Sequence, residues 1–282
     1  MHALRSSIAV PFVLMALMSA LAIAIFAAPT RAEEKAPVAP LAQAHAHNDY
    51  LHERPLLDAL DHGFTSVEAD IYLVDGKLLV AHTAREIKPE RTLEKLYLEP
   101  LRSRVRAGSG SVYPGGAPFH LLIDLKSPAE PTYAALAKVL AEYSDIISAV
   151  RDGKIESKAV NVTISGNRPT RILSAEKVRY AGLDGRLSDL GSNEPVHLLP
   201  VISDSWAAHF KWKGVGPLGD AERKKLTDAV SKAHARGRRI RFWATPESVA
   251  AWRELQGAGV DMINTDDLAG LEAYLRANPA AN

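Results

Sequence analysis

The fold is decided by residues 65–73, Thr-Ser-Val-Glu-Ala-Asp-Ile-Tyr-Leu, a β-type run that carries two acidic residues among apolar ones. A strand projects residues i and i+2 from the same face, so Glu68 and Asp70 point one way together. The apolar residues between them point the other way, toward a core. The stretch therefore predicts a strand that is buried on one side and chemically active on the other.

A second run, residues 119–126, ends on Asp124-Leu125-Lys126 with the same two-residue spacing. If the two strands are neighbours, three carboxylates and an ammonium group converge. Like-charged carboxylates share a confined space at low cost only when a cation or a proton lies between them. Oxygen ligands of this kind favour Mg²⁺ or Ca²⁺, so the sequence predicts a divalent cation site.

Apolar runs alternate with helical patterns along the chain. We expect strands at residues 41–47, 65–73, 119–126, 160–165, 198–203, 240–244 and 260–264, and an accessory strand at 77–81. Helical spacing follows at 136–143, 226–233, 249–255 and 268–275, with Thr245 and Pro246 as the cap and first turn of the third helix. Repeated strand-then-helix units imply a parallel α/β sheet, best closed as a (β/α)₈ TIM barrel. An open doubly wound sheet is the alternative, but no glycine-rich phosphate loop supports it.

The amino end resembles a targeting segment. Arg5 precedes a nearly uninterrupted apolar stretch, and Thr30-Arg31-Ala32 offers small residues for a signal peptidase. We expect a signal peptide at residues 1–32, a linker at 33–42 and one barrel domain at 43–282, in a protein exported to the periplasm or the extracellular space. The rival is an uncleaved membrane anchor, since the apolar stretch approaches the ~20 residues of a spanning helix.

Composition excludes several classes. Removal of residues 1–32 takes away two arginines and no acids, so the net charge goes from +1 to about −1, and no basic face for nucleic acid remains. With no cysteine, disulfides, thiolate metal sites and a cysteine nucleophile are excluded. We expect a monomer that touches a membrane only through its substrate.

Several motifs in order resemble one superfamily. They are His47-Asn48-Asp49-Tyr50, the run 63–70, Val80-Ala81-His82, Ile123-Asp124-Leu125-Lys126 and the closing run 259–266. Together they are similar to the phosphatidylinositol-specific phospholipase C and glycerophosphodiester phosphodiesterase superfamily, in particular to its poorly characterised branch with a yeast mitochondrial-inheritance protein. The resemblance covers about residues 43–275 and implies a barrel phosphodiesterase.

The resemblance also implies roles. His47 and His82 would be the catalytic acid and base, and the metal ligands would be Glu68, Asp70, Asp124 and, as in eukaryotic phospholipase C, Asn48. A second alignment, to the His-x-x-Asn spacing of spider sphingomyelinase D, makes His45 catalytic instead. We favour His47 and keep His45 as its substitute or supporting partner. The His-Arg-Gly signature of glycerophosphodiesterases is absent, which leaves their substrate preference in doubt.

The chemistry suits these residue types independently of the family. Cleavage of a phosphodiester needs charge neutralised on the non-bridging oxygens, a base for the nucleophile and an acid for the leaving oxygen. A divalent ion and Lys126 meet the first need, and two histidines meet the others. Arg168 and Arg186, after the candidate fourth and fifth strands, are expected to clamp phosphate oxygens. The sequence predicts a phosphoric diester hydrolase or lyase for a small-molecule or lipid-headgroup substrate.

Two other functions remain open. His45-Ala46-His47 is a His-x-His at the end of a first strand, as in amidohydrolase-like zinc enzymes, with Asp266 after the last strand. Residues 181–186 and 203–206 contain none of the further imidazoles that such a site needs, and we expect Asp266 and Asp267 to cap the last helix instead. The second alternative is a non-catalytic exported binding protein, in which one of the carboxylates or histidines should be replaced; none is.

Overall fold

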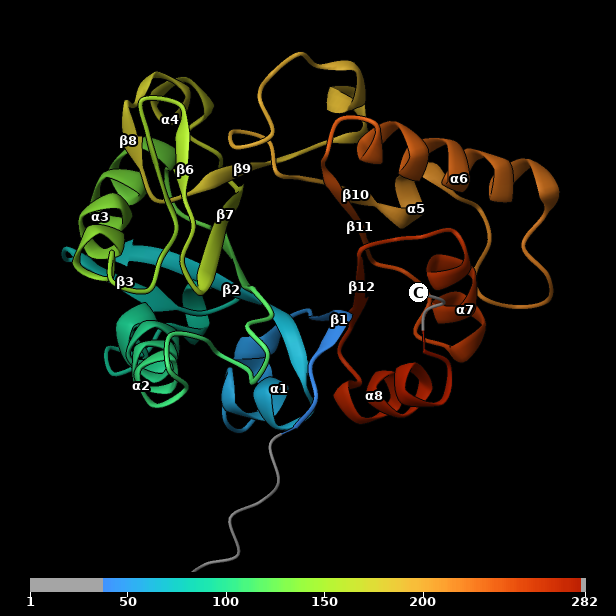
Figure 1. Cartoon of the computed structure of the whole chain (residues 1–282), viewed down its shortest axis with the longest axis horizontal. Helices are drawn as coiled ribbons and strands as arrows, with labels where there is room; N and C mark the ends of the chain where they lie inside the picture. The colour runs from blue at the N-terminus through green and yellow to red at the C-terminus, as the bar shows by residue number, and fades with distance from the viewer. Residues whose placement is uncertain (1–37, 280–282) are drawn as a thin grey trace, which may run out of the picture. The chain divides into compact units, whose positions relative to one another are not determined.

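Eight parallel strands form a closed ring in the computed structural model, which describes residues 38–279 (Figure 1). The strands follow one another around the ring as β1-β12-β11-β10-β9-β7-β4-β2, and pairing of β1 with β2 closes it. Their bounds are β1 Leu41–Ala46, β2 Phe64–Val74, β4 Phe119–Leu125, β7 Val160–Gly166, β9 Gly182–Gly185, β10 Val201–Ser205, β11 Arg239–Trp243 and β12 Met262–Thr265. The predicted TIM barrel is confirmed, and the open sheet is excluded.

Helices lie outside the ring of strands (Figure 1). They are α1 Leu57–Asp61, α2 Glu99–Ala107, α3 Ala129–Glu142, α4 Thr170–Ala175, α5 Trp206–His209, α6 Asp220–His234, α7 Val249–Gly257 and α8 Leu268–Ala277, with short helical turns at Asp49–Leu51, Ala84–Glu86, Glu94–Leu98 and Leu187–Gly191. The accessory strand β3, Lys77–Val80, pairs antiparallel with β2, and β5 Ala149–Arg151, β6 Lys154–Glu156 and β8 Val178–Arg179 form a separate small sheet. The long helix α3 follows β4, and the long helix α6 leads into β11, as strand-then-helix units require.

Two details differ from the sequence expectations. Strand β9 was not among the predicted apolar runs, because glycines stand at both of its ends and only four residues form it. The cap of α7 is Ser248, whose side chain accepts a hydrogen bond from the amide of Ala251, so the prediction of Thr245 and Pro246 was wrong. Asp267 caps α8 as expected, and its side chain accepts from the amide of Gly270.

The hydrophobic core lies between the strands and the helices, not inside the ring. Val67, Ala69 and Ile71 of β2 belong to this core, together with residues of the same phase on the other strands. The alternating residues face the interior of the ring, and many of them are polar: Ser66, Glu68, Asp70, His120, Thr163, Asp184, Ser203 and Arg241 are all buried. The strand period therefore sorts apolar residues outward and chemically active residues inward.

The targeting prediction lies outside the described residues, since the proposed signal peptide and half of the linker precede residue 38. Strand β1 begins at Leu41, inside the end of the predicted linker. Between residues 38 and 279, the chain has no helix with the length and apolar character needed to cross a membrane.

Candidate active site

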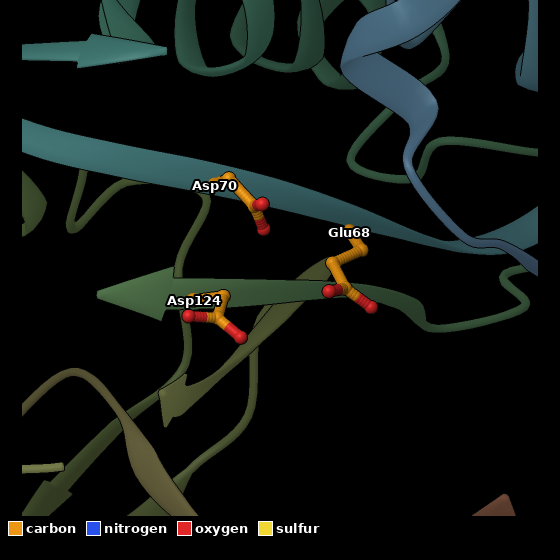
Figure 2. A group of neighbouring side chains, drawn as sticks. All are labelled: Glu68, Asp70 and Asp124. Atoms are coloured by element: carbon orange, nitrogen blue, oxygen red, sulfur yellow. The ribbon is translucent and has the colours of Figure 1, made fainter. Parts of the chain in front are cut away.

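Three carboxylates gather where β2 and β4 approach the rim of the barrel. Asp70 and Asp124 are paired positions of these neighbouring strands. Glu68 comes two residues before Asp70, so it lies deeper in the barrel on the same face. One ligand oxygen from each lies within 4.8 Å of the others. Figure 2 shows the carboxyl groups of Glu68 and Asp70 leaving β2 on the side where Asp124 extends from β4. The predicted convergence of these side chains is what the structure shows.

Two cations accompany the carboxylates. Arg241 of β11 is buried, and its Nη1 donates to Glu68 Oε2 over 2.8 Å. Lys126 Nζ lies 3.1 Å from Asp70 Oδ2 and 3.3 Å from Asp124 Oδ1. Three ionised carboxylates against two cations leave an excess of negative charge in a place with little solvent.

The pKa values of the cluster reflect this excess. Burial, followed by the charge of Glu68, raises the pKa of Asp70 to about 6, although Lys126 opposes the shift. Burial also raises the pKa of Asp124. For Glu68 burial acts in the same direction, but the charge of Arg241 and the neighbouring His45 outweigh it and hold its pKa well below the usual range. An added cation near Asp70 would favour its ionised form.

The cluster fits such a cation on a structural criterion. Asp70 is fully buried, yet its Oδ1 has no hydrogen-bond partner among the described residues. Leaving a buried acceptor unpaired costs about 1–3 kcal/mol, more for a charged group. An oxygen-only ligand set of this kind suits Mg²⁺ or Ca²⁺. No imidazole belongs to the ligand group found among residues 38–279, which disfavours the zinc hydrolase alternative.

Tyr50 joins the two sides of the site. Its hydroxyl lies 2.7 Å from Asp70 Oδ2, 2.6 Å from Asn48 Oδ1 and 2.9 Å from His82 Nδ1. His82 Nδ1 is also 3.1 Å from Asp70 Oδ2, and half of the His82 side chain (51 %) is exposed. A proton on Nδ1 that is donated to Asp70 leaves Nε2 of His82 open to solvent.

His47 has its own carboxylate. Its Nδ1 lies 2.9 Å from Asp266 Oδ1, and the side-chain amide of Asn48 donates to the same oxygen over 3.3 Å. Burial lowers the pKa of His47, but the hydrogen bond to Asp266 and the charge of Glu68 outweigh it, so the pKa is raised. Asp266 thus orients an imidazole, whereas the sequence suggested a helix cap.

His45 lies deeper and is occupied on both nitrogens. Nδ1 is 2.7 Å from Ser66 Oγ, and Nε2 is 2.6 Å from Arg241 Nη1, which must be the donor because guanidinium has no lone pair to offer. The side chain is completely buried. Burial, then the charge of Arg241, lowers the pKa of His45 to about 3, so this imidazole is neutral at physiological pH.

The two arginines expected to clamp phosphate both contact Asp184. Arg186 Nη1 lies 2.9 Å from Asp184 Oδ2, and Arg168 donates to the backbone carbonyl of Asp184. Asp184 is buried and also accepts from the hydroxyls of Ser165 and Ser203. No hydrogen bond or ion pair within residues 38–279 connects either arginine to the three carboxylates.

Three residues of the site were not predicted from the sequence to take part in it. Arg241 lies in the predicted strand 240–244, and its alternation with Ile240 and Phe242 marks an inward position, but no role was predicted for it. Tyr50 stood in a quoted motif without a role. Asp266 lies 219 residues from His47, so no local pattern could have paired them.

Gly166 is a position where a small change should disturb the carboxylate cluster. It has a φ of +66°, and a Cβ there would overlap Asp124 Oδ1 and come within 2.7 Å of the carbonyl oxygen of Leu125. We expect Gly166→Ala to displace Asp124 and to weaken divalent cation binding at least tenfold, as measured by calorimetric titration. Gly191→Ala is the control, because a Cβ at position 191 meets nothing within 4 Å. Unchanged cation affinity in Gly166→Ala would contradict a ligand role for Asp124.

Removal of Arg241 should destabilise the protein through the buried charge that it leaves behind. Arg241→Met leaves Glu68 buried without its partner, and breaking such a pair costs about 3–5 kcal/mol. We expect that loss in the free energy of unfolding measured with urea, and less than about 0.5 kcal/mol for Arg236→Met on the surface. The double variant Glu68→Gln/Arg241→Met should recover part of the loss. Equal stability of Arg241→Met and the parent protein would show that the pair is not formed.

Solved structures with a similar fold were found for this chain. A calcium-dependent phosphoinositol-specific phospholipase C from Pseudomonas sp. aligns with a TM-score of 0.52 at 12% identity, over 81% of this chain and 89% of the other. A glycerophosphodiester phosphodiesterase from Agrobacterium tumefaciens aligns with a TM-score of 0.50 at 16% identity, over 84% and 100%. At these identities the likeness shows the fold alone, which is the TIM barrel.

Sequence comparison shows the family to which the chain belongs. The AIM6-like phosphodiesterase domain matches residues 34–109, and the glycerophosphoryl diester phosphodiesterase family matches residues 239–269. Altered inheritance of mitochondria protein 6 of Eremothecium gossypii is 30% identical over 274 residues, which span 83% of this chain and 69% of that protein. The chain belongs to the altered inheritance of mitochondria protein 6 family, which confirms the resemblance inferred from the motifs.

Proposed function

We propose that the protein is a metal-dependent phosphoric diester hydrolase or lyase. Its substrate class is a small glycero- or inositol-phosphodiester or a phospholipid headgroup. The observation that carries the proposal is the unpartnered Asp70 Oδ1 within a buried carboxylate cluster that is flanked by His47 and His82. A barrel phosphodiesterase fold and family support it.

Glu68, Asp70 and Asp124 would hold Mg²⁺ or Ca²⁺, with Asn48 as a further ligand. Asn48 Oδ1 accepts from Tyr50 over 2.6 Å, and a carbonyl oxygen has a second lone pair for a cation. When bound, the ion would neutralise charge on the non-bridging oxygens of the phosphodiester. Lys126 lies against Asp70 and Asp124, where its ammonium group would add to that neutralisation.

His47 is the first of the two proposed acid/base groups. Its Nδ1 lies 2.9 Å from Asp266 Oδ1 and 2.9 Å from the side-chain amide of Asn48. A proton on Nδ1 that is donated to Asp266 would leave Nε2 as the basic nitrogen that takes a proton from the nucleophile. This arrangement supports His47 over His45. Both nitrogens of His45 are engaged inside the ring, and its low pKa leaves it neutral, without the extra proton that a general acid gives. His45 would instead position Glu68 and Arg241.

His82 is the second group. Its Nδ1 is held by Asp70 and Tyr50, and its exposed half faces solvent, from which a substrate would enter. A protonated His82 would give its Nε2 proton to the leaving oxygen. The nucleophile is water or a neighbouring hydroxyl of the substrate, and the second choice gives a cyclic phosphate as the first product.

The test is a panel of glycerophosphodiesters, inositol phosphodiesters and phospholipids, assayed with phosphorus NMR to distinguish cyclic from open products. We expect turnover of at least one substrate, loss of turnover in a chelator, and recovery with Mg²⁺ or Ca²⁺. Recovery with Zn²⁺ alone would favour the zinc hydrolase alternative. Turnover that survives chelation would remove the metal from the proposal, and no turnover across the panel would overturn it.

We also propose that the protein is exported, on the composition of residues 1–32. Mass spectrometry of the protein from its native cells should find an amino end near Glu33 in the exported fraction. An intact amino end in the membrane fraction would show an uncleaved anchor, and an intact amino end in the soluble intracellular fraction would contradict export.

A further inference from the structure

A cavity of about 550 Å³ opens at the end of the barrel opposite to the carboxylate cluster. Residues at the amino ends of seven barrel strands line it: Gln43 of β1, Thr65 of β2, His120 of β4, Asn161 of β7, Gly182 of β9, Val201 of β10 and Arg239 of β11. Its size falls within the about 300–1,000 Å³ of small-molecule pockets. It shares none of its lining residues with the proposed active site.

Unpartnered polar atoms line this cavity. His120 Nε2, Thr163 Oγ1 and Arg179 Nε are buried without a hydrogen-bond partner among the described residues. The three residues are 5%, 0% and 5% exposed, respectively. Several unpaired polar groups in one cavity are costly for an empty protein, since each such group costs about 1–3 kcal/mol. A bound molecule with hydrogen-bonding atoms would satisfy them.

The charge of the lining is positive. Arg179 contacts the His197 ring, and Arg239 donates to the carbonyl oxygens of Ala42 and Asp261. Neither arginine forms an ion pair with a carboxylate within residues 38–279. Burial and the charge of Arg179 lower the pKa of His197, which favours a neutral ring.

The one lining carboxylate is already engaged. Asp261 Oδ2 lies 2.8 Å from His234 Nε2 and accepts from the amide of Ile240 over 2.8 Å. Two guanidinium groups against one carboxylate leave a single positive charge, which matches a monoanion better than a doubly charged phosphate monoester.

The remaining walls are apolar. Pro118, Ala149 and Val150 line the cavity, and so do Ile155 and Val196, which are 54% and 39% exposed. Ile155 and Val196 are among the few large apolar residues that the described surface exposes. An apolar body lying against them would remove their surface from water, which stabilises a complex.

We propose that this cavity binds an amphiphilic carboxylate, a molecule with one anionic head and an aliphatic or aromatic body. Its carboxylate pairs with Arg179, and its body packs against Val150, Ile155 and Val196. The proposal is independent of the phosphodiesterase chemistry, since the cavity and the carboxylate cluster lie at opposite ends of the barrel.

Calorimetric titration of the full-length protein with decanoate, below the concentration at which it forms micelles, tests the proposal. We expect saturable binding of one decanoate, and binding at least tenfold weaker for decanol and for acetate. These two probes lack the charge and the apolar body, respectively. No saturable binding of decanoate would overturn the proposal, and equal binding of decanol would overturn the role of the charge.

Variants locate the site. Arg179→Gln should raise the dissociation constant for decanoate at least tenfold, and Thr163→Val, which keeps the side-chain shape, about threefold if its hydroxyl contributes. The matched control is Arg236→Gln, an exposed arginine that does not line the cavity, and its constant should change less than twofold. Circular dichroism confirms folding. If Arg179→Gln fails to fold, Thr163→Val and Arg239→Gln decide, and unchanged binding in both would place decanoate elsewhere.

Discussion

His47→Ala is expected to lower kcat/KM for a phosphodiester substrate by about 10²–10⁴-fold, the usual contribution of a positioned acid/base group. The structure gives the reason: Asp266 holds Nδ1, so that the opposite nitrogen is presented to the site with a fixed orientation. Asp266→Asn keeps the imidazole but removes the charge that orients it, and a smaller loss is expected. Steady-state kinetics on the purified variants measure both.

The matched control is another histidine with a carboxylate partner. His234 Nε2 lies 2.8 Å from Asp261 Oδ2, away from the carboxylate cluster. His234→Ala should leave kcat/KM within about twofold of the parent value, since exposed pairs of this kind contribute little beyond local stability. If His45→Ala lowered turnover by the same factor while His47→Ala did not, the assignment of the first acid/base group would be reversed.

Asp70→Asn should abolish cation-dependent turnover while leaving the protein folded. The substitution keeps the shape of the side chain but removes the carboxylate that has an unpaired, buried oxygen. We expect a loss of at least about 100-fold in kcat and at least tenfold weaker binding of Mg²⁺ or Ca²⁺ by calorimetry. Asp228→Asn, on the surface of α6, is the control and should change neither quantity.

The pH dependence of its stability tests the Asp70→Asn variant independently of turnover. The pKa of Asp70 is raised to about 6 from an ordinary value of 3.8, so the folded state holds its proton more firmly than the unfolded state does. Its contribution to stability is complete below pH 3.8 and is lost as the pH rises through 6. Without added cation, Asp70→Asn should therefore be more stable than the parent at pH 8, and the difference should shrink toward pH 4. A less stable variant at pH 8 would contradict the charge crowding.

The two-residue period of a strand was enough to predict which side chains share a face of the sheet. Residues 65–73 alone place Glu68 and Asp70 on one face, and the same period places Asp124 beside Lys126. Barrel closure followed from the number of strand-then-helix units. The depth of His45 relative to His47 did not follow, because local pattern does not show which strand residues lie at the rim and which lie inside.

Partners across the ring could not be predicted. Arg241 and Glu68 are 173 residues apart and meet only because closure brings β11 opposite β2. Tyr50 reaches Asp70 and His82 from a helical turn after β1, where nothing in the local pattern indicates its direction. Strand β9 was missed since its pairing with β7 and β10, rather than its own propensity, defines it.

The barrel wall has an aliphatic outer side and an ionised inner side, and this division makes the protein easy to engineer. Replacements at outward positions such as Ile123 and Ile164 touch only the layer beneath the helices. Better filling of that layer raises the melting temperature through packing alone. Replacements at outward-facing positions should therefore give a heat-resistant variant with unaltered turnover. Replacements at inward-facing positions should change the substrate preference.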